Sequence, residues 1–235
     1  MSFSVIILYY IPEGDFMKTD LRVLAYNYIK DKILNNEYTS NQIISEKMIS
    51  DELSISKTPV KEAFLYLENE NFVVINPRKS VSVREVDLKL IKDIFQVRVR
   101  IEPLIVELTI NSMNKEKLTK SLLDFKKKFT KMSGMKNVDN NEFDKLYDSY
   151  RYFFADNCGN LFFSEQMNLV YDHLHRIRKV LYGNAARRLE ALEEHIYIIN
   201  CILDNSAIEF VKELCEKHIE EAQMDFFKNL DNLNI

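Results

Sequence analysis

From Asp87 onward, apolar residues recur at the spacing of helix faces and no strand pattern persists. The chain has only four Gly and four Pro among 235 residues, which suits a helix-rich protein and argues against a β-sandwich. Asn and Ser in the breaks between stretches are candidate N-caps. Successive helices with short connections predict an antiparallel bundle, where ligand sites form between facing helices. The predicted helices cover about 88–112, 115–133, 139–157, 161–181, 185–203 and 206–230.

The first third of the chain has shorter patterns. Two helical patterns, Glu46–Leu53 and Pro59–Asn69, are joined at Ser54-Ile55-Ser56. Two short helices with such a turn predict a helix-turn-helix, whose second helix enters the major groove of DNA. A longer helical stripe precedes this pair, and two β-type runs around a basic tip follow it as a hairpin, or wing. These three elements are Leu21–Leu34, Phe72–Ile75 and Val81–Val86.

The start of the second short helix carries side chains suited to phosphates and base edges. Ser56 is a candidate N-cap whose hydroxyl can accept a free backbone N–H, and Pro59 lies in the first turn, where its missing N–H costs nothing. Lys57, Thr58 and Lys61 project from this turn as two cations and a hydroxyl. Taken alone, the hexapeptide fits an ordinary capped surface helix equally well.

Charge supports DNA binding only locally. The net charge is −4, and residues 17–86 contain ten Lys+Arg and ten Asp+Glu. Binding to a polyanion must therefore depend on a small cluster and should be strongly salt-sensitive. The cluster comprises Lys57, Lys61, Arg78, Lys79 and Arg84.

A longer run resembles a known family. Residues 44–64, ISEKMISDELSISKTPVKEAF, are similar to the signature of the GntR family of bacterial transcription regulators, and residues 67–73 and 76–83 continue the likeness through the wing. Residues 97–103, VRVRIEP, resemble the segment that opens the helical ligand domain of the FadR-type (FCD) subfamily. The resemblance implies a mainly α protein, with an N-terminal winged helix-turn-helix and a C-terminal FCD-like helical bundle.

The expected organisation has three segments. Residues 1–16 would be a disordered lead or the product of an over-early start codon, residues 17–86 the winged helix-turn-helix, and residues 87–235 the effector-binding and dimerisation domain. The resemblance implies a sequence-specific transcription regulator, expected to be a repressor controlled by a small carboxylate such as an organic or sugar acid. Its expected partners are a short inverted repeat of double-stranded DNA, this effector and a second copy of the chain.

A cytoplasmic location is expected. No segment reaches the roughly 18 apolar residues of a membrane span, so no membrane partner is expected. Cys158, Cys201 and Cys215 have no metal-type spacing and an odd count, which indicates reduced thiols. The resemblance also implies DNA contacts, although Ser80 stands where relatives usually carry Gly. The candidate DNA-binding residues are Ser45, Lys47, Ser56, Lys57, Thr58, Lys61, Arg78, Lys79 and Ser80.

FCD domains commonly hold a metal with an Asp and a His four apart on one helix, plus two later His. The later pair matches His195 and His218. Counted back from Gly159-Asn160, however, the first two positions fall on Tyr147 and Arg151, and a guanidinium cannot serve as a metal ligand. The sequence therefore assigns no cofactor, and a divalent transition metal stays only one alternative because Arg151 stands in a ligand position. The residues expected around the effector pocket are Arg98, Asp144, Asp148, Arg151, His195 and His218.

Three interpretations of this pocket remain open. His195, His218 and Asp148 could hold a weakly bound metal, since imidazole and carboxylate suit such ions. Arg151 could instead bind a carboxylate effector directly by a bidentate pair. In the third, both histidines are hydrogen-bonded core residues and Arg151 pairs with Asp148 or Asp144. His173 and His175, two apart on a helix, face different sides and are expected at the surface or an interface.

The sequence does not favour an enzyme. It lacks a phosphate loop G-x-x-x-x-G-K-[ST], a nucleophile elbow G-x-S-x-G and a metalloprotease H-E-x-x-H. A metal-dependent hydrolase built on His195 and His218 would lack a third ligand and a general base. A helical interaction protein without DNA binding is the other competing function, and the neutral charge of residues 17–86 is its only support.

Overall fold

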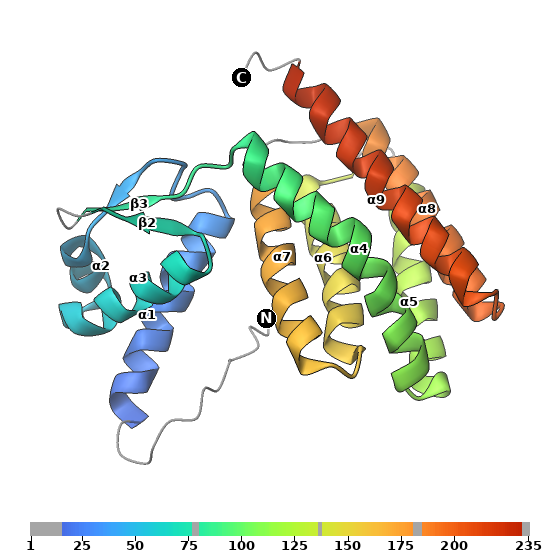
Figure 1. Cartoon of the computed structure of the whole chain (residues 1–235), viewed down its shortest axis with the longest axis horizontal. Coiled ribbons are helices and arrows are strands. Elements are labelled where there is room, and N and C mark those ends of the chain that lie inside the picture. Colours follow the sequence, from blue (N-terminus) through green and yellow to red (C-terminus); the bar gives the residue numbers. More distant parts are fainter. Residues whose placement is uncertain (1–15, 77–79, 136–137, 181–184, 232–235) are drawn as a thin grey trace. The chain divides into compact units, whose positions relative to one another are not determined.

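The computed structural model describes residues 16–76, 80–135, 138–180 and 185–231. The chain divides into two compact units, with the boundary between Glu85 and Val86 (Figure 1). None of the helices described has the length and apolar character needed to cross a membrane.

The helices of the first unit follow the sequence pattern closely. α2 (Glu46–Leu53) has its predicted bounds, while α3 (Lys57–Asn69) begins two residues earlier than predicted. α1 (Phe16–Leu34) likewise begins before the predicted Leu21. α1 packs against α3, and the apolar stripes of the two helices form about half of the buried hydrophobic core of this unit. The fully buried core residues of these two helices are Ala25, Ile29, Ile33, Val60, Ala63, Phe64 and Leu67.

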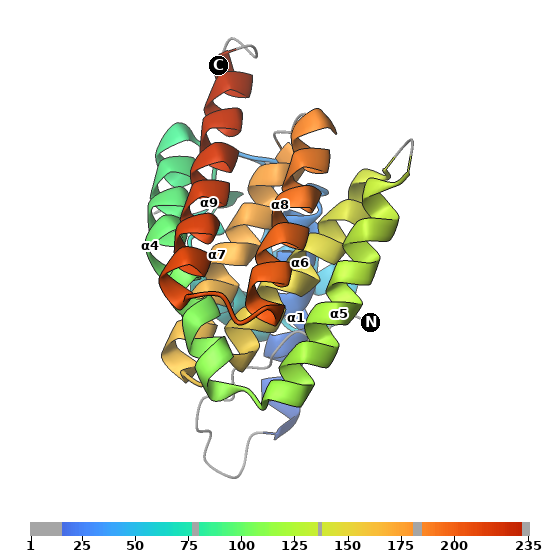
Figure 2. The ribbon, with the colours of Figure 1, turned by 90° about the vertical axis from the view of Figure 1, so that its right-hand side faces the viewer.

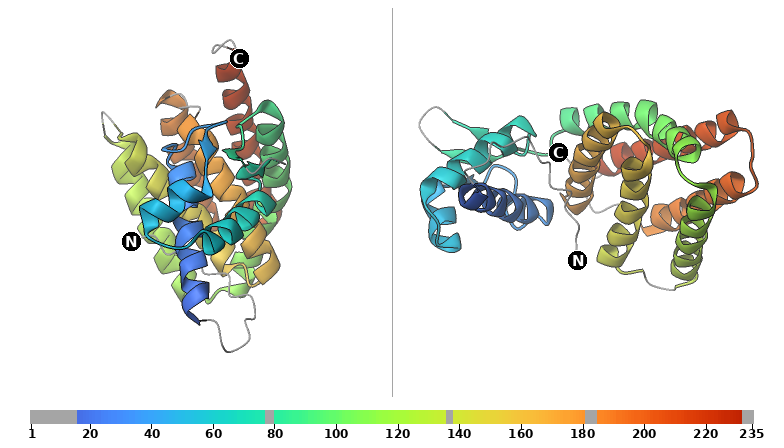
Figure 3. Two further views of the ribbon diagram at one scale, coloured as in Figure 1. Left: turned by 90° about the vertical axis from the view of Figure 1, so that its left-hand side faces the viewer. Right: turned by 90° about the horizontal axis from the view of Figure 1, so that it is seen from below.

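The described strands form a small antiparallel sheet in the order β1-β3-β2. β2 (Val73–Ile75) and β3 (Val81–Val83) make the predicted hairpin, which is visible beside α1 in the right-hand view of Figure 3. β3 ends at Val83, so the prediction that it reaches Val86 was wrong. Its partner β2 begins at Val73, and beyond the Val73–Val83 pair only the N–H of Arg84 continues the ladder, to the carbonyl of Phe72. β1 (Ile43–Ile44) pairs with β3 and was not predicted.

The described part of the second unit contains helices only, as predicted. Side-chain oxygens of Asp87, Asn114, Asp139 and Asn160 accept backbone N–H groups and cap four of these helices at their starts. These four helices begin within a residue of their predicted starts, whereas α9 begins two residues after the predicted 206. The helices are α4 (Leu88–Ser112), α5 (Lys115–Ser133), α6 (Asn140–Asn157), α7 (Leu161–Val180), α8 (Ala185–Leu203) and α9 (Ile208–Asp231).

Figure 2 shows these helices running side by side as a bundle. α4 packs against α9, α7 and α6, while α5 packs against α8 and α6. α6 also packs along α7, and α8 along α9. Pairs distant in sequence therefore enclose the interior, where aromatic rings such as Phe129 and Tyr150 pack edge to face.

Gly159 connects α6 to α7 and should tolerate no side chain. Its φ of +72° is in the left-handed region, and a Cβ there would lie 2.9 Å from Cβ of Ser112. Gly159→Ala should therefore lower the free energy of unfolding by about 1–3 kcal/mol, measured by urea denaturation. Gly134→Ala is the matched control, because its nearest neighbours lie 3.7 Å away and its φ is −79°. Equal stability of the two variants would contradict the prediction.

Candidate functional site

The turn between α2 and α3 is fixed by local backbone geometry. Ser45 is the N-cap of α2, and its hydroxyl accepts the N–H of Met48 at 3.1 Å. Ser54 ends α2 in the left-handed conformation, with φ 54° and ψ 41°, and its N–H bonds back to the last turn. After this reversal only Ile55 and Ser56 precede α3, whose first residues lie exposed at the surface.

The predicted contact residues of α3 lie exposed at its start. Lys57, Thr58 and Lys61 are all exposed, whereas Pro59 faces the core. Ser56 is the N-cap by position, but its hydroxyl makes no capping hydrogen bond, so this detail of the prediction was wrong. Its ψ of 162° is extended, and the exposed hydroxyl is left available to a ligand along with the first N–H groups of α3.

The remaining predicted contacts are less uniform. Lys47 is exposed on α2, and Ser45 is exposed although its hydroxyl is used as a cap. Ser80 is half-buried at the loop end of the hairpin, where its carbonyl accepts the N–H of Asn76. Arg78 and Lys79 lie outside the described residues.

A cavity of about 90 Å³ lies within the helical bundle. α4, α6, α7, α8 and α9 all contribute to it, and its apolar wall includes Phe143, Leu174 and Phe226. Among the described residues, five arginines line it, against the carboxyl groups of Asp144 and Asp225. The cavity is therefore suited to an anion. The lining arginines are Arg98, Arg151, Arg178, Arg187 and Arg188.

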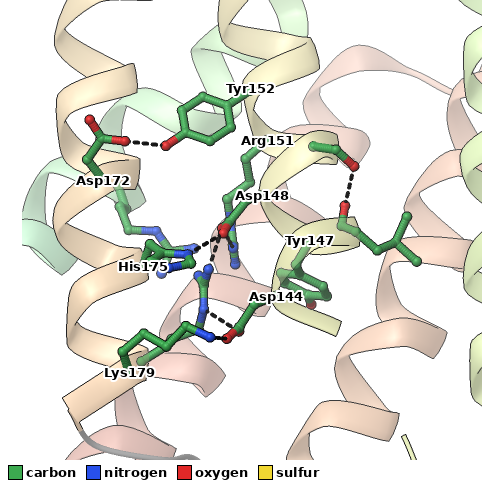
Figure 4. A network of polar contacts seen from close by, with 12 residues as sticks. Asp144, Tyr147, Asp148, Arg151, Tyr152, Asp172, His175 and Lys179 are labelled. Carbon is green, nitrogen blue, oxygen red and sulfur yellow. Dashed lines mark hydrogen bonds and ion pairs between the residues drawn. The ribbon is translucent and has the colours of Figure 1, made fainter. Parts of the chain in front are cut away.

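Asp144 and Asp148 of α6 are bound by side chains of α7 (Figure 4). Arg178 donates to Asp144 at 3.0 Å and also to Asp148. Lys179 lies 3.1 Å from the second oxygen of Asp144, and Nδ1 of His175 lies 2.6 Å from Asp148. Both carboxylates are thus fully engaged although they are buried.

This network fixes the charge of its members. Burial opposes ionisation of Asp148, but Arg178, His175 and Arg151 outweigh it and lower the pKa of that carboxyl to about 2. Burial would lower the pKa of Arg178, but Asp148 and Asp144 raise it. Both partners therefore stay charged at neutral pH.

Arg151 is left without a full partner. It is buried, and Nη1 has no hydrogen-bond partner among the residues that the structure describes. The nearest carboxylate oxygen, of Asp148, is 3.8 Å away, and the guanidinium lies 4.4 Å from the centre of the Tyr147 ring. Burial, Arg98 and Arg178 lower the pKa of Arg151 to about 10, so it remains a cation at neutral pH. Arg98 itself is paired with Glu102.

His218 is oriented by a carboxylate. Its Nδ1 bonds to Glu194, and Arg187 binds both oxygens of Glu194 at 2.7 and 2.8 Å. Nε2 of His218 is buried and has no hydrogen-bond partner within the described part of the chain. Burial, Arg151, Arg98 and Arg187 hold the pKa of His218 well below its usual value.

His195 lies among aromatic rings and is not one of the residues that line the cavity. Its Nδ1 is 3.3 Å from the Tyr147 hydroxyl, and its ring centre is 4.3 Å from that of His218. Burial, His218 and Arg151 hold its pKa well below the usual value. Both histidines are therefore neutral.

The donor set does not fit a metal. Asp148, the third ligand considered from the sequence, is bound by Arg178 and His175. Within the described ranges, no three His, Cys, Asp or Glu side chains are grouped so that they could hold a metal ion. The nearby Arg151 guanidinium would also repel a cation.

Sequence reasoning missed the α7 partners of the acidic pair. His175 was expected at the surface or an interface, but it is bound to Asp148, and His173 is buried. The sequence does contain a signal for this pairing. Arg178 and Lys179 follow His175 by three and four residues, so the three side chains form a basic stripe on one helix face. This stripe complements Asp144 and Asp148, which are four residues apart.

Comparison with known proteins agrees with this architecture. Residues 21–83 match the family described as bacterial regulatory proteins, gntR family, and residues 93–221 match the FCD domain. The uncharacterised HTH-type transcriptional regulator YdhC of Bacillus subtilis (strain 168) is 24% identical over 194 residues, which cover 83% of this chain and 84% of that protein.

Solved structures show the same fold. E. coli McbR/YncC has a TM-score of 0.73 at 17% identity, covering 89% of this chain and 98% of that one. The metal-free FCD domain of TM0439 has a TM-score of 0.51 at 21% identity, covering 63% of this chain and 99% of that one.

Proposed function

Because this chain belongs to the GntR family of bacterial regulatory proteins and carries an FCD domain, we propose that it is a cytoplasmic, homodimeric repressor whose operator affinity is controlled by a small carboxylate. The family identifies a transcriptional regulator with a DNA-binding helix-turn-helix, not an enzyme. The FCD domain implies a small-molecule ligand. The repressor role, the dimer and the class of effector are the proposal.

The observation that carries the carboxylate proposal is the incomplete pairing of Arg151. A buried guanidinium stays charged and requires a partner. The acids that might have neutralised it, Asp144 and Asp148, are engaged by α7. Nη1 is therefore free to bind a carboxylate that enters the cavity, and the surrounding arginines favour the same charge.

The dimer and the inverted repeat follow from the size of the DNA-binding unit. One helix-turn-helix contacts a short stretch of base pairs, and two copies related by a two-fold axis read two half-sites. A single copy would bind its operator weakly at physiological salt, because the described recognition helix carries few cations that could contact phosphates.

The experiment measures binding of the full-length protein to the DNA upstream of its own gene, by fluorescence anisotropy, with and without a panel of organic and sugar acids. We expect a dimer on an inverted repeat, lower transcription from that promoter in vitro, and at least one acid that changes the DNA dissociation constant by about 5- to 150-fold. A monomer with full affinity would overturn the dimer. Activation of the promoter would overturn the repressor role, and indifference to every acid would overturn the effector class.

A further inference from the structure

Among the described residues, four buried polar atoms without hydrogen-bond partners belong to side chains that line the cavity: Nη1 of Arg151, Nη1 of Arg178, Nε of Arg187 and Nε2 of His218. Arg178 and Arg187 already bind carboxylates through their other nitrogens. The two atoms that remain to be matched by a ligand are therefore Nη1 of Arg151, from α6, and Nε2 of His218, from α9. The residues are 7% and 5% exposed, respectively. Both lie close to the same ring, since the Arg151 guanidinium is 4.4 Å and the His218 ring 6.3 Å from the centre of Tyr147. A buried polar group without a partner is unfavourable, so a ligand that satisfies both atoms at once gains affinity.

The first atom requires an acceptor. Arg151 remains protonated at neutral pH, and every nitrogen of a guanidinium can only donate. The adjacent Asp148 is 3.8 Å away and already accepts from Arg178 and His175. An anionic oxygen in the cavity would complete the pairing of Arg151.

The second atom requires a donor. Arg187 binds both oxygens of Glu194 and balances its negative charge. Glu194 therefore accepts a hydrogen bond from His218 but does not require that ring to be positively charged. The imidazole proton therefore lies on Nδ1, which faces Glu194. With its proton on Nδ1, the imidazole has a lone pair on Nε2. A ligand must offer this atom an O–H or N–H.

The surrounding charge decides which donor is suitable. The charges of Arg151, Arg98 and Arg187 all act on His218 and disfavour a second positive charge there. An ammonium group is therefore unsuitable, whereas a neutral hydroxyl is not repelled. A cavity of about 90 Å³ holds on the order of six water-sized groups, which limits the ligand to a small acid. The apolar wall of Phe143, Leu174 and Phe226 suits a short alkyl chain.

Resting on the proposed function, we infer that the cavity binds a small hydroxycarboxylate directly, without a metal ion: Arg151 binds the carboxylate, and Nε2 of His218 accepts a hydrogen bond from the hydroxyl. In this arrangement the side chains contact the ligand themselves and do not form a metal site. Arg151 supplies the positive charge that a metal would otherwise present to the ligand.

The test uses ligands with the same carbon chain, so that the unmodified protein decides the question. Full-length protein dialysed against EDTA is titrated calorimetrically with 2-hydroxybutyrate, 3-hydroxybutyrate, butyrate and 2-aminobutyrate. We expect one hydroxy acid to bind at least about tenfold more tightly than butyrate, because butyrate leaves Nε2 unpaired. 2-Aminobutyrate should bind more weakly than that hydroxy acid. Added Zn²⁺ or Ni²⁺ should leave these affinities unchanged.

Two variants assign the contacts. His218→Phe should bring the ratio of the hydroxy-acid and butyrate affinities close to one, and His218→Gln, which keeps an acceptor oxygen, should restore part of the preference. Arg151→Met should weaken the hydroxy acid and butyrate alike. Far-UV circular dichroism checks that each variant is folded.

The outcomes separate the two proposals. Equal binding of butyrate and both hydroxy acids would overturn the hydroxyl inference while leaving the carboxylate effector in place. Tighter binding of 2-aminobutyrate, or binding only after metal is added, would overturn the inference in the same way. If none of the acids bound at millimolar concentration, both this inference and the proposed class of effector would be wrong.

Discussion

Replacing Arg178 with methionine is expected to lower the free energy of unfolding by about 3–5 kcal/mol, because it leaves buried carboxylates without their shared counter-ion. Arg178 donates to both Asp144 and Asp148. The side chain of methionine fills much of the same space but carries no charge. Lys179 and His175 remain, each beside only one of the two acids. Urea unfolding followed by far-UV circular dichroism measures the loss.

Two further variants test the reason for that loss. Lys128→Met breaks an exposed pair with Asp124 one turn away, and it should change stability by no more than about 1 kcal/mol. Adding Asp148→Asn to Arg178→Met should recover part of the loss, since it removes one of the unpaired carboxylates. If Arg178→Met were as stable as the wild type, the network would not stabilise the bundle.

Lys57→Ala and Lys61→Ala should each weaken operator binding by about 1–3 kcal/mol if the lysine contacts a guanine, and the double variant should lose specific binding at physiological salt. Both side chains are exposed at the start of α3, so their removal should leave the free energy of unfolding within about 0.5 kcal/mol. Fluorescence anisotropy over a range of salt separates the two kinds of contact. A base contact relaxes specificity at one position, whereas a phosphate contact lowers the salt slope by about one.

Lys127→Ala is the matched control for these variants. Lys127 is an exposed lysine of α5, so its loss makes the same change in net charge in the other unit. It should leave operator affinity nearly unchanged. Operator binding by both α3 variants that is indistinguishable from the wild type would refute the assignment of α3 as the recognition helix.

The helices of the bundle could be predicted because each has a long apolar stripe and four of them begin at a side-chain cap, as α5 does at Asn114. Periodicity over many residues is a strong signal. β1 could not be predicted, because Ile43–Ile44 offers only two residues and becomes a strand by pairing with Ser82 and Val81. The length of β3 was similarly set by its partner strands rather than by its own sequence.

The candidate site was predictable in part as a set of residues but not as a set of pairs. Of the residues proposed from the family pattern, Arg98, Asp144, Arg151 and His218 line one cavity, whereas Asp148 and His195 do not. The basic side chain that binds Asp148 is decided by the register between α6 and α7, and this register cannot be read from the sequence alone. For this reason the sequence left the pairing of Arg151 open, while the structure assigns Asp148 to His175 and Arg178.

The bridge made by Arg178 has a mechanical consequence. Asp144 and Asp148 are one helical turn apart, so sliding α6 past α7 by one turn, about 5.4 Å, would place one acid where the other had been and leave a carboxylate without a base. The contact therefore acts as a stop against longitudinal slip. We expect α6 and α7 to move as one rigid body, and any rearrangement that follows ligand entry to be taken up by α4, α8 and α9, the other walls of the cavity.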